Sequence, residues 1–280
     1  NGWNSLWSVD IVKQKQIDIL LFVTVIIISL FGLMMIYSSS YIWAEYKFDD
    51  PFKYLKAQGL FFIIGIALMI IVSKIYYKNY LDKANIILIA CLFLLVLVLI
   101  PGIGSIRNGS RSWFGIGSFG IQPSEFVKLG LIIFTAKYLA KNNKDIRDIK
   151  KGVLPILLVA LFVFGLIMLQ PDFGTGVIVI MSITGLLFVS GVKLSFFTKL
   201  GILGILGSIG LIITAPYRLQ RILSFLDPWR DALGSGFQTI QSLFAIGNGG
   251  LLVLGLGNLI KKHFYLPEPQ TDFIFAVISE

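Results

Sequence analysis

The sequence predicts an all-α polytopic membrane protein, because its composition, its long apolar runs and the placement of its basic residues all indicate that class. Of 280 residues, 56% are hydrophobic and 14% are charged, and the mean hydropathy is +0.85. A soluble domain carries about 25% charged residues. Too few charges therefore remain to cover a surface that faces water, and we expect lipid to surround most of the chain.

Seven runs approach the roughly 20 apolar residues that cross a hydrocarbon core. They cover residues 19–37, 57–73, 84–106, 124–139, 152–171, 173–192 and 200–217, the fourth being apolar only after its first turn. Another apolar run begins at Phe273, and the sequence stops at Glu280. We therefore expect seven transmembrane helices and the start of an eighth, in a single integral membrane domain, residues 1–280, that is truncated at its C-terminus.

The distribution of lysine and arginine predicts that the N-terminus is cytoplasmic. With that orientation, the inner segments before residue 218 carry thirteen basic residues and the outer loops carry five. Cytoplasmic loops are the ones enriched in lysine and arginine. The first run is longer than the core of a cleaved signal peptide, so we expect it to stay as an anchor. The net charge of +9 then reflects topology, and no nucleic-acid partner is expected.

A long connection, residues 218–271, follows the seventh run and is expected outside the membrane. Its middle, residues 232–260, is uncharged and long enough to span, but it contains seven glycines and four glutamines or asparagines. We therefore expect short interfacial or re-entrant helices here in preference to a true span. A true span would move Asp272 to the cytoplasmic side.

Charged residues cluster where the fourth run begins. Pro123 suits a first helical position, and Glu125 in the first turn is favoured by the helix dipole. Glu125 and Lys128 are three residues apart and share one helix face. They form either a local ion pair that starts the helix or a charged site that faces a cavity. Ionisable groups near a membrane span are costly enough to keep the second interpretation open.

Further polar candidates lie at the other expected outer ends. Arg111 could hold a phosphate beside Trp113, which could equally be an interface anchor. Asp172, between two spans, is expected to cap the following helix. Arg218 and Arg221 offer guanidinium groups that match phosphate oxygens, with snorkelling to lipid headgroups as the alternative.

Two more aspartates are placed at helix starts. Asp227 precedes Pro228, which is the order of an N-cap and a first helical position. Asp272 precedes the eighth run, where it either caps a helix or, partly desolvated, serves as a general base. Cys91 is the only cysteine and is expected to be a small buried residue. The lone His263 predicts no metal site.

In register, these segments resemble the SEDS family (shape, elongation, division and sporulation), which includes FtsW, RodA and SpoVE. The stretches that carry the resemblance are 108–113, 122–125, 170–175, 221–228, 236–247 and 266–275. The resemblance implies about ten helices and a peptidoglycan glycosyltransferase that polymerises lipid II at the outer face of the bacterial cytoplasmic membrane. It also implies a class B penicillin-binding protein, a transpeptidase, as partner.

The resemblance places the family's essential aspartate on Asp272 and its fourth-helix Glu and Lys on Glu125 and Lys128. We expect Asp272 to be the base of one inverting displacement. Arg111, Arg218 and Arg221 would balance the pyrophosphate charge, a task that a divalent cation, Mg or Mn, could share. The other expected substrate-binding residues are Trp113, Gln238, Gln241 and Ser242, and the expected structural residues are Pro123, Ser124, Asp172, Asp227 and Pro228.

Two other functions remain open at this point. A lipid II flippase would also use broken helices and intramembrane charges, although no inverted repeat is visible. A non-catalytic scaffold is the other, because Val253 and Leu259 stand where the family usually has a glycine and a small polar residue. The sequence leaves a division, elongation or sporulation role equally open.

Overall fold

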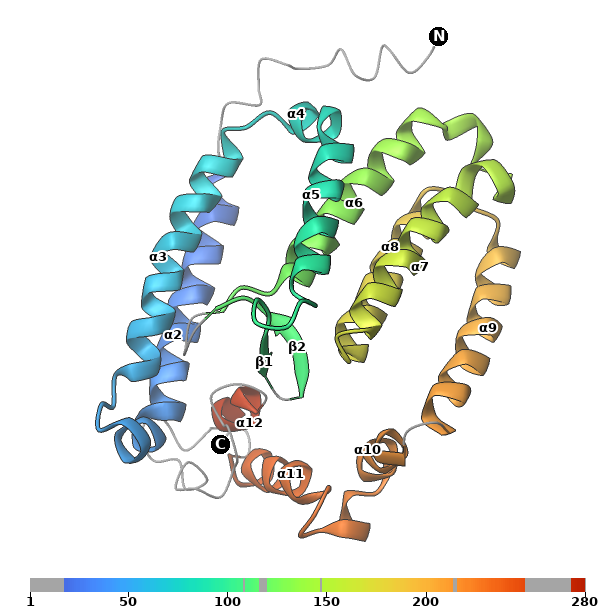
Figure 1. The fold of residues 1–280 in the computed structure, drawn as a ribbon. Helices are drawn as coiled ribbons and strands as arrows, with labels where there is room; N and C mark the ends of the chain where they lie inside the picture. The colour runs from blue at the N-terminus through green and yellow to red at the C-terminus, as the bar shows by residue number, and fades with distance from the viewer. Residues whose placement is uncertain are drawn as a thin grey trace. The chain divides into compact units, whose positions relative to one another are not determined.

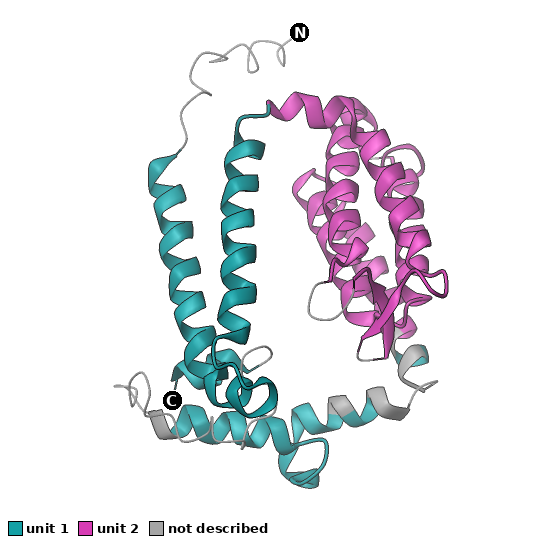
Figure 2. Ribbon diagram, turned by 60° about the vertical axis from the view of Figure 1, so that its left-hand side comes forward, with its two compact units in different colours: residues 1–75, 209–280 teal, residues 76–208 magenta. Residues whose placement is uncertain are grey.

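The structure is a computed structural model that describes residues 18–107, 109–115, 120–146, 148–213, 216–249 and 273–279. These residues form helices and one small hairpin (Figure 1). Figure 2 shows two compact units, which are residues 1–75 with 209–280 (unit 1) and residues 76–208 (unit 2).

Unit 1 begins with two long helices, α2 (Ile19–Phe48) and α3 (Lys53–Ser73), which pack against each other. The Asp18 carboxylate accepts a hydrogen bond from the main-chain N–H of Leu21 at 3.0 Å and so starts α2. Thirty residues make a helix about 45 Å long, which exceeds a hydrocarbon core of about 30 Å. Part of α2 therefore extends beyond the membrane.

The rest of unit 1 consists of shorter elements. They are α10 (Pro216–Leu226), the 3₁₀ helix η3 (Pro228–Asp231), α11 (Phe237–Gly249) and α12 (Ile274–Ser279). α11 packs against η3 and α12, and α12 also packs against α2. The 13 described residues of α11 make about 20 Å of helix. α10 and η3 are short helices of the kind expected within residues 218–271.

Unit 2 is built around α6. Its elements are α4 (Tyr77–Asp82), α5 (Ala84–Leu97), β1 (Ser105–Arg107), β2 (Ser110–Trp113), α6 (Pro123–Lys141), η1 (Asn143–Asp145), η2 (Ile149–Val153), α7 (Leu154–Met168), α8 (Phe173–Val189) and most of α9 (Leu194–Ile213). α6 packs against α4, α5, α7 and α8. A Cβ atom added at Gly130 would lie 3.3 Å from Cys91 Sγ, so a glycine lets α5 and α6 approach closely.

The expected fold class is confirmed. The seven expected spans correspond to α2, α3, α5, α6, α7, α8 and α9, and α12 begins where the eighth was expected. In the described part of the chain, three helical segments are long and apolar enough to cross a membrane, namely Ile19–Phe48, Lys53–Ser73 and Ile149–Met168. Ala84–Leu97, Phe173–Val189 and Leu194–Gly207 are shorter apolar helices.

The third span was predicted too long. The apolar run reaches residue 106, but α5 ends at Leu97 and Ile106 lies in β1. Pro101 disfavours helical backbone in the residue before it. Gly102 then adopts φ +91°, a conformation that side-chain-bearing residues rarely take. The chain therefore turns while its side chains are still apolar.

The end of α2 and the start of α9 also differ from the expected positions. α2 continues eleven residues beyond the expected end at Tyr37, and α9 starts at Leu194 instead of residue 200. The expected starts and ends were set by polar or charged residues such as Lys199, which lies inside α9. A lysine near a helix end can extend its ammonium to the membrane surface while its backbone stays helical, so charge marks a span poorly.

Candidate functional site

The candidate site in unit 2 lies where the β1–β2 hairpin meets the first turn of α6 and the α7–α8 junction. β1 and β2 are antiparallel, and Ser105 pairs with Trp113 while Ile106 pairs with Arg111. Ser112 is therefore an extra residue, and a bulge of this kind interrupts the alternation of side chains along the strand. Ser112 is buried.

The bulge separates Arg111 from Trp113. In an unbroken strand, residues two apart lie on the same face. Here Trp113 shares a face with Arg107, whose guanidinium carbon lies 5.1 Å from the centroid of the Trp113 ring. Arg111 lies on the other face, half-buried. Arg107, and not the neighbouring Arg111, therefore makes the cation–π contact with Trp113.

Arg107 was not among the site residues predicted from the sequence. Its guanidinium also packs against the main chain of Gly120, where an added Cβ would lie 2.8 Å from the guanidinium carbon. A guanidinium held against an aromatic ring and a glycine has little freedom to move. Arg107 and Trp113 lie six residues apart in one expected outer loop, and this spacing by itself does not reveal their contact.

The hairpin is joined to the α7–α8 junction by hydrogen bonds. Ser110 Oγ donates to the main-chain oxygen of Gln170, and it lies 3.0 Å from Ser112 Oγ. The Gln170 side chain is fully buried, and its Nε2 donates to the main-chain oxygen of Leu95 at 3.3 Å. Gln170 therefore links the hairpin, α5 and the end of α7.

Asp172 occupies the N-cap of α8 and uses both carboxylate oxygens. Oδ1 accepts from the main-chain N–H of Thr175 at 3.2 Å, and Oδ2 accepts from Thr175 Oγ1 at 2.8 Å. Gln122 Nε2 also donates to Oδ2 at 2.9 Å. The carboxylate therefore ties the residue before α6 to the first turn of α8. Gln122, Gln170 and Thr175 are in the family stretches but were not predicted as site residues.

The first turn of α6 carries both buried and exposed polar groups. Pro123 is the first helical residue, and Ser124 is fully buried. Lys128 Nζ donates to Glu125 Oε1 at 2.7 Å, and the Lys128 side chain is 21% exposed while that of Glu125 is 55% exposed. The structure thus forms the local ion pair. Ser124 Oγ and Gln170 Oε1 are buried without a hydrogen-bond partner among the described residues, so both are available to a bound polar group.

The remaining candidates belong to unit 1. Gln238 is exposed on the first turn of α11, and Gln241 and Ser242 are half-buried one turn later. Ser242 Oγ donates to the main-chain oxygen of Thr239 at 2.7 Å. Asp227 lies before η3 without a capping hydrogen bond from its side chain, and Pro228 is the first residue of η3.

The other predicted residues are described only by their backbone or lie outside the described part of the chain. Arg218 and Arg221 lie in α10, and only the backbone of these two residues is described. Asp272, Val253, Leu259 and His263 lie outside the described residues. Within the described residues, no group of three His, Cys, Asp or Glu side chains could hold a metal ion, so no protein-held metal is assigned there.

In the described part of residues 218–271, the carboxyl group of Asp231 has a shifted pKa. Its carboxylate accepts from the main-chain N–H of Ser235 at 2.8 Å and from Ser235 Oγ at 2.9 Å. These bonds, the main-chain one first, lower the pKa of Asp231 below its usual value of 3.8. Asp231 thus orders the turn between η3 and α11 through its charged form.

The described geometry is that of a membrane protein with a fixed polar cluster at the ends of its spans, and known proteins place it in a family. A model of the family described as "Cell cycle protein" (FtsW, RodA and SpoVE) matches residues 18–280. The chain belongs to this family, as the resemblance to the SEDS family predicted.

Individual relatives and a solved structure agree. The chain is 48% identical over 268 residues to Stage V sporulation protein E of Bacillus subtilis (strain 168), which covers 96% of this chain and 73% of that protein. It is 38% identical over 266 residues to "Probable peptidoglycan glycosyltransferase FtsW" of Saccharophagus degradans, covering 95% and 69%. A chain in a solved peptidoglycan synthase complex that coordinates polymerization and crosslinking matches with a TM-score of 0.62 and 32% identity, covering 90% and 69%.

Proposed function

We propose that this protein is a peptidoglycan glycosyltransferase that polymerises lipid II into glycan strands at the outer face of the bacterial cytoplasmic membrane. The observation that carries the proposal is the family match over residues 18–280, together with relatives named as peptidoglycan glycosyltransferases over nearly the whole chain. The polar cluster held at the ends of apolar helices is a suitable place for a substrate with a lipid tail and a charged head.

The proposed orientation puts the N-terminus in the cytoplasm. It rests on the thirteen inner and five outer basic residues before residue 218. In this orientation the β1–β2 hairpin, the α7–α8 junction and residues 218–271 all face the outside. The candidate residues of both units would then be exposed to the same compartment as the substrate head group.

The proposed reaction is one inverting displacement. Asp272 removes the proton from the acceptor hydroxyl of lipid II as that oxygen forms a bond to the anomeric carbon of the growing chain. The bond from the anomeric carbon to the pyrophosphate oxygen breaks, and undecaprenyl pyrophosphate leaves with the electron pair. An α-linked donor gives a β-linked product, so no covalent carboxylate intermediate is needed.

The other candidates have proposed roles in binding. Arg111, Arg218 and Arg221 would balance the negative charge that develops on the pyrophosphate. Glu125 and Lys128 would act on the acceptor side or behind the residues that touch substrate. The remaining proposed substrate contacts are Trp113 on β2 and Gln238, Gln241 and Ser242 on α11.

Two further components belong to this proposal. A divalent cation, Mg or Mn, is proposed only as a companion of the substrate pyrophosphate. The proposed partner is a class B penicillin-binding protein, a transpeptidase. Its support is the similarity to a chain of a synthase complex that couples polymerization to crosslinking.

The test is lipid II polymerisation by the purified full-length protein with its transpeptidase partner, comparing wild type, Asp272→Asn and Asp227→Asn. Removing a general base should slow the reaction by about 10²–10⁴-fold. Asp227→Asn makes the same chemical change at a carboxylate without a capping bond and should leave the rate near wild type. Adding a chelator to the same assay tests the proposed cation.

Three other results would contradict the proposed reaction. Polymerisation by a folded Asp272→Asn variant at the wild-type rate would show that Asp272 is not the base. Wild-type protein that moves lipid II across vesicles without polymerising it would be a flippase. Wild-type protein that does neither but still binds the transpeptidase would be a scaffold.

A further inference from the structure

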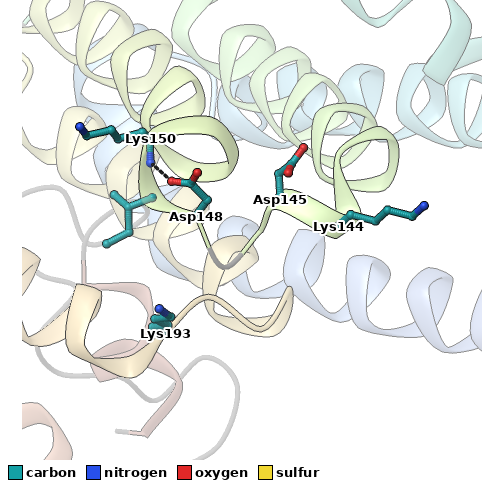
Figure 3. A pocket seen from close by; sticks show the side chains of 6 residues that line it. Lys144, Asp145, Asp148, Lys150 and Lys193 are labelled. Atoms are coloured by element: carbon teal, nitrogen blue, oxygen red, sulfur yellow. Dashed lines mark hydrogen bonds between the residues drawn. The ribbon is translucent and has the colours of Figure 1, made fainter.

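At the end of α6 that lies away from the hairpin, unit 2 contains a hollow with a volume of about 610 Å³. Its lining residues are Lys144, Asp145, Asp148, Ile149, Lys150 and Lys193 (Figure 3). They come from η1, from the start of η2 and from the residue just before α9. None of these residues takes part in the proposed reaction.

The hollow is built by close packing of the α6–α7 connection. A Cβ added at Gly152 would overlap the main-chain oxygen of Asp145 and would lie 2.8 Å from Ile146 Cα. A glycine is therefore required where η2 folds back against the preceding turn. Ile146 and Val153 are buried in the core of unit 2 and anchor the connection on both sides of Asp148.

A second contact fixes the same connection. Tyr138 Oη, on the last turns of α6, donates to the main-chain oxygen of Lys151 at 2.9 Å. Asn142 Nδ2 donates to the main-chain oxygen of Tyr138 at 3.0 Å. Lysines carried by this segment are therefore attached to a fixed backbone, unlike lysines of a flexible loop.

Positive charge predominates in the hollow. Lys144, Lys150 and Lys193 form no ion pair with any residue that the structure describes. The carboxylate of Asp148 accepts a hydrogen bond from the main-chain N–H of Lys150 at 3.0 Å, as Figure 3 shows. The lining has three lysines and two aspartates, and the Asp148 carboxylate is already hydrogen-bonded, so the hollow carries a net positive charge and suits an anion.

The surface next to the hollow is apolar. Val189, at the end of α8, is 85% exposed, and Leu194, at the start of α9, is 68% exposed. Val189 lies four residues before Lys193 and Leu194 one residue after it, so the α8–α9 turn that carries this lysine also carries exposed apolar side chains. A soluble phosphate would gain nothing from that apolar surface, whereas a phospholipid has both an anionic head and acyl chains.

We propose that this hollow binds the phosphate of an anionic glycerophospholipid. Lys150 and Lys193 contact the headgroup, Lys144 contributes to the local potential, and the acyl chains run along Val189 and Leu194. Basic pockets between helices at a membrane surface bind anionic lipid headgroups in this way. Such a lipid would brace the α6–α7 connection against the α8–α9 turn.

The test is native mass spectrometry of the purified full-length protein in an uncharged detergent, titrated with dioleoylphosphatidylglycerol or with dioleoylphosphatidylcholine. Each surface lysine near an anionic lipid contributes roughly a fivefold effect on affinity. The double variant K150Q/K193Q should therefore bind phosphatidylglycerol at least about tenfold more weakly. The control K74Q/K83Q removes the same charge outside the hollow and should bind like wild type.

Two further arms make the result decisive. Asp145→Asn removes a negative charge from the hollow and should tighten phosphatidylglycerol binding, an effect that a misfolded variant cannot produce. Inorganic phosphate should not compete. Equal weakening in both double variants, equal binding of the two lipids, or displacement by inorganic phosphate would each overturn the proposal.

Discussion

The α5–α8 helices of unit 2 and the α2–α3 pair of unit 1 are all expected spans, but they bury their side chains very differently. α3 has no buried residue, and the buried residues of α2 lie only between Met35 and Ala44. In unit 2, buried residues recur along the lengths of α5, α6, α7 and α8. Apolarity thus identifies a span but not its neighbours.

The physical reason is that lipid and protein interiors are about equally apolar. A leucine gains little by moving from acyl chains to a protein contact, so helices associate through shape and close packing. Gly130 against Cys91 is one such contact between α5 and α6. Unit 2 is therefore expected to be a rigid support for the hairpin, and α3 is expected to tolerate substitution.

The largest difference should follow from Leu131→Ala compared with Leu68→Ala. Leu131 is fully buried in α6, whereas Leu68 on α3 is 54% exposed. Buried leucine-to-alanine changes cost about 2–5 kcal/mol, and we expect the lower end because lipid lowers the transfer contribution. Leu68→Ala should stay within about 0.5 kcal/mol.

Thermal unfolding in detergent micelles measures both variants. Equal shifts in Tm would show that α3 is packed as tightly as α6 in the intact protein, and the contrast between the units would then be wrong.

A smaller difference should separate two aspartates at helix starts. Asp172 receives hydrogen bonds from Thr175 and Gln122, whereas the Asp227 side chain makes no capping bond. Asp172→Ala should destabilise the protein by about 1–2 kcal/mol, the usual effect of losing a cap. Asp227→Ala should change stability by no more than a few tenths of a kcal/mol.

Chemical denaturation of both variants in micelles checks this comparison. Hydrogen exchange should also rise in the first turn of α8 for Asp172→Ala only. Greater destabilisation by Asp227→Ala would mean that the long connection depends on its caps more than unit 2 does.

The smallest effect concerns the pH dependence of the turn after η3. Hydrogen bonds from Ser235 lower the folded-state pKa of Asp231 below 3.8. A lowered carboxyl pKa stabilises the charged form, so its contribution is complete above pH 3.8 and is lost as the pH falls through the lower folded value.

Carboxyl ¹³C NMR of labelled aspartate should therefore show, among the resonances that titrate below 3.8, one that disappears in Asp231→Asn, while that of Asp50, whose pKa is also lowered, remains. Titration of the Asp231 resonance above 3.8 would show that the Ser235 bonds are absent in solution.

Much of the fold was predictable because its signals are local. The seven spans and the start of the eighth follow from the length of the apolar runs. Helix ends were less predictable at Ile106 and Lys199, since the first is apolar in a strand and the second is charged in a helix.

The candidate site, like the fold, was partly predictable from the sequence and partly not. The sequence by itself determined the membrane class, the family and the positions of Asp172, Glu125 and Lys128 at helix starts, because local spacing and composition set these. Only the tertiary structure decided that Arg107 stacks on Trp113, that a bulge turns Arg111 to the other face, and that Gln170 joins the hairpin to α5. Those contacts join residues distant in sequence, and their geometry depends on strand register and helix packing, which no local pattern encodes.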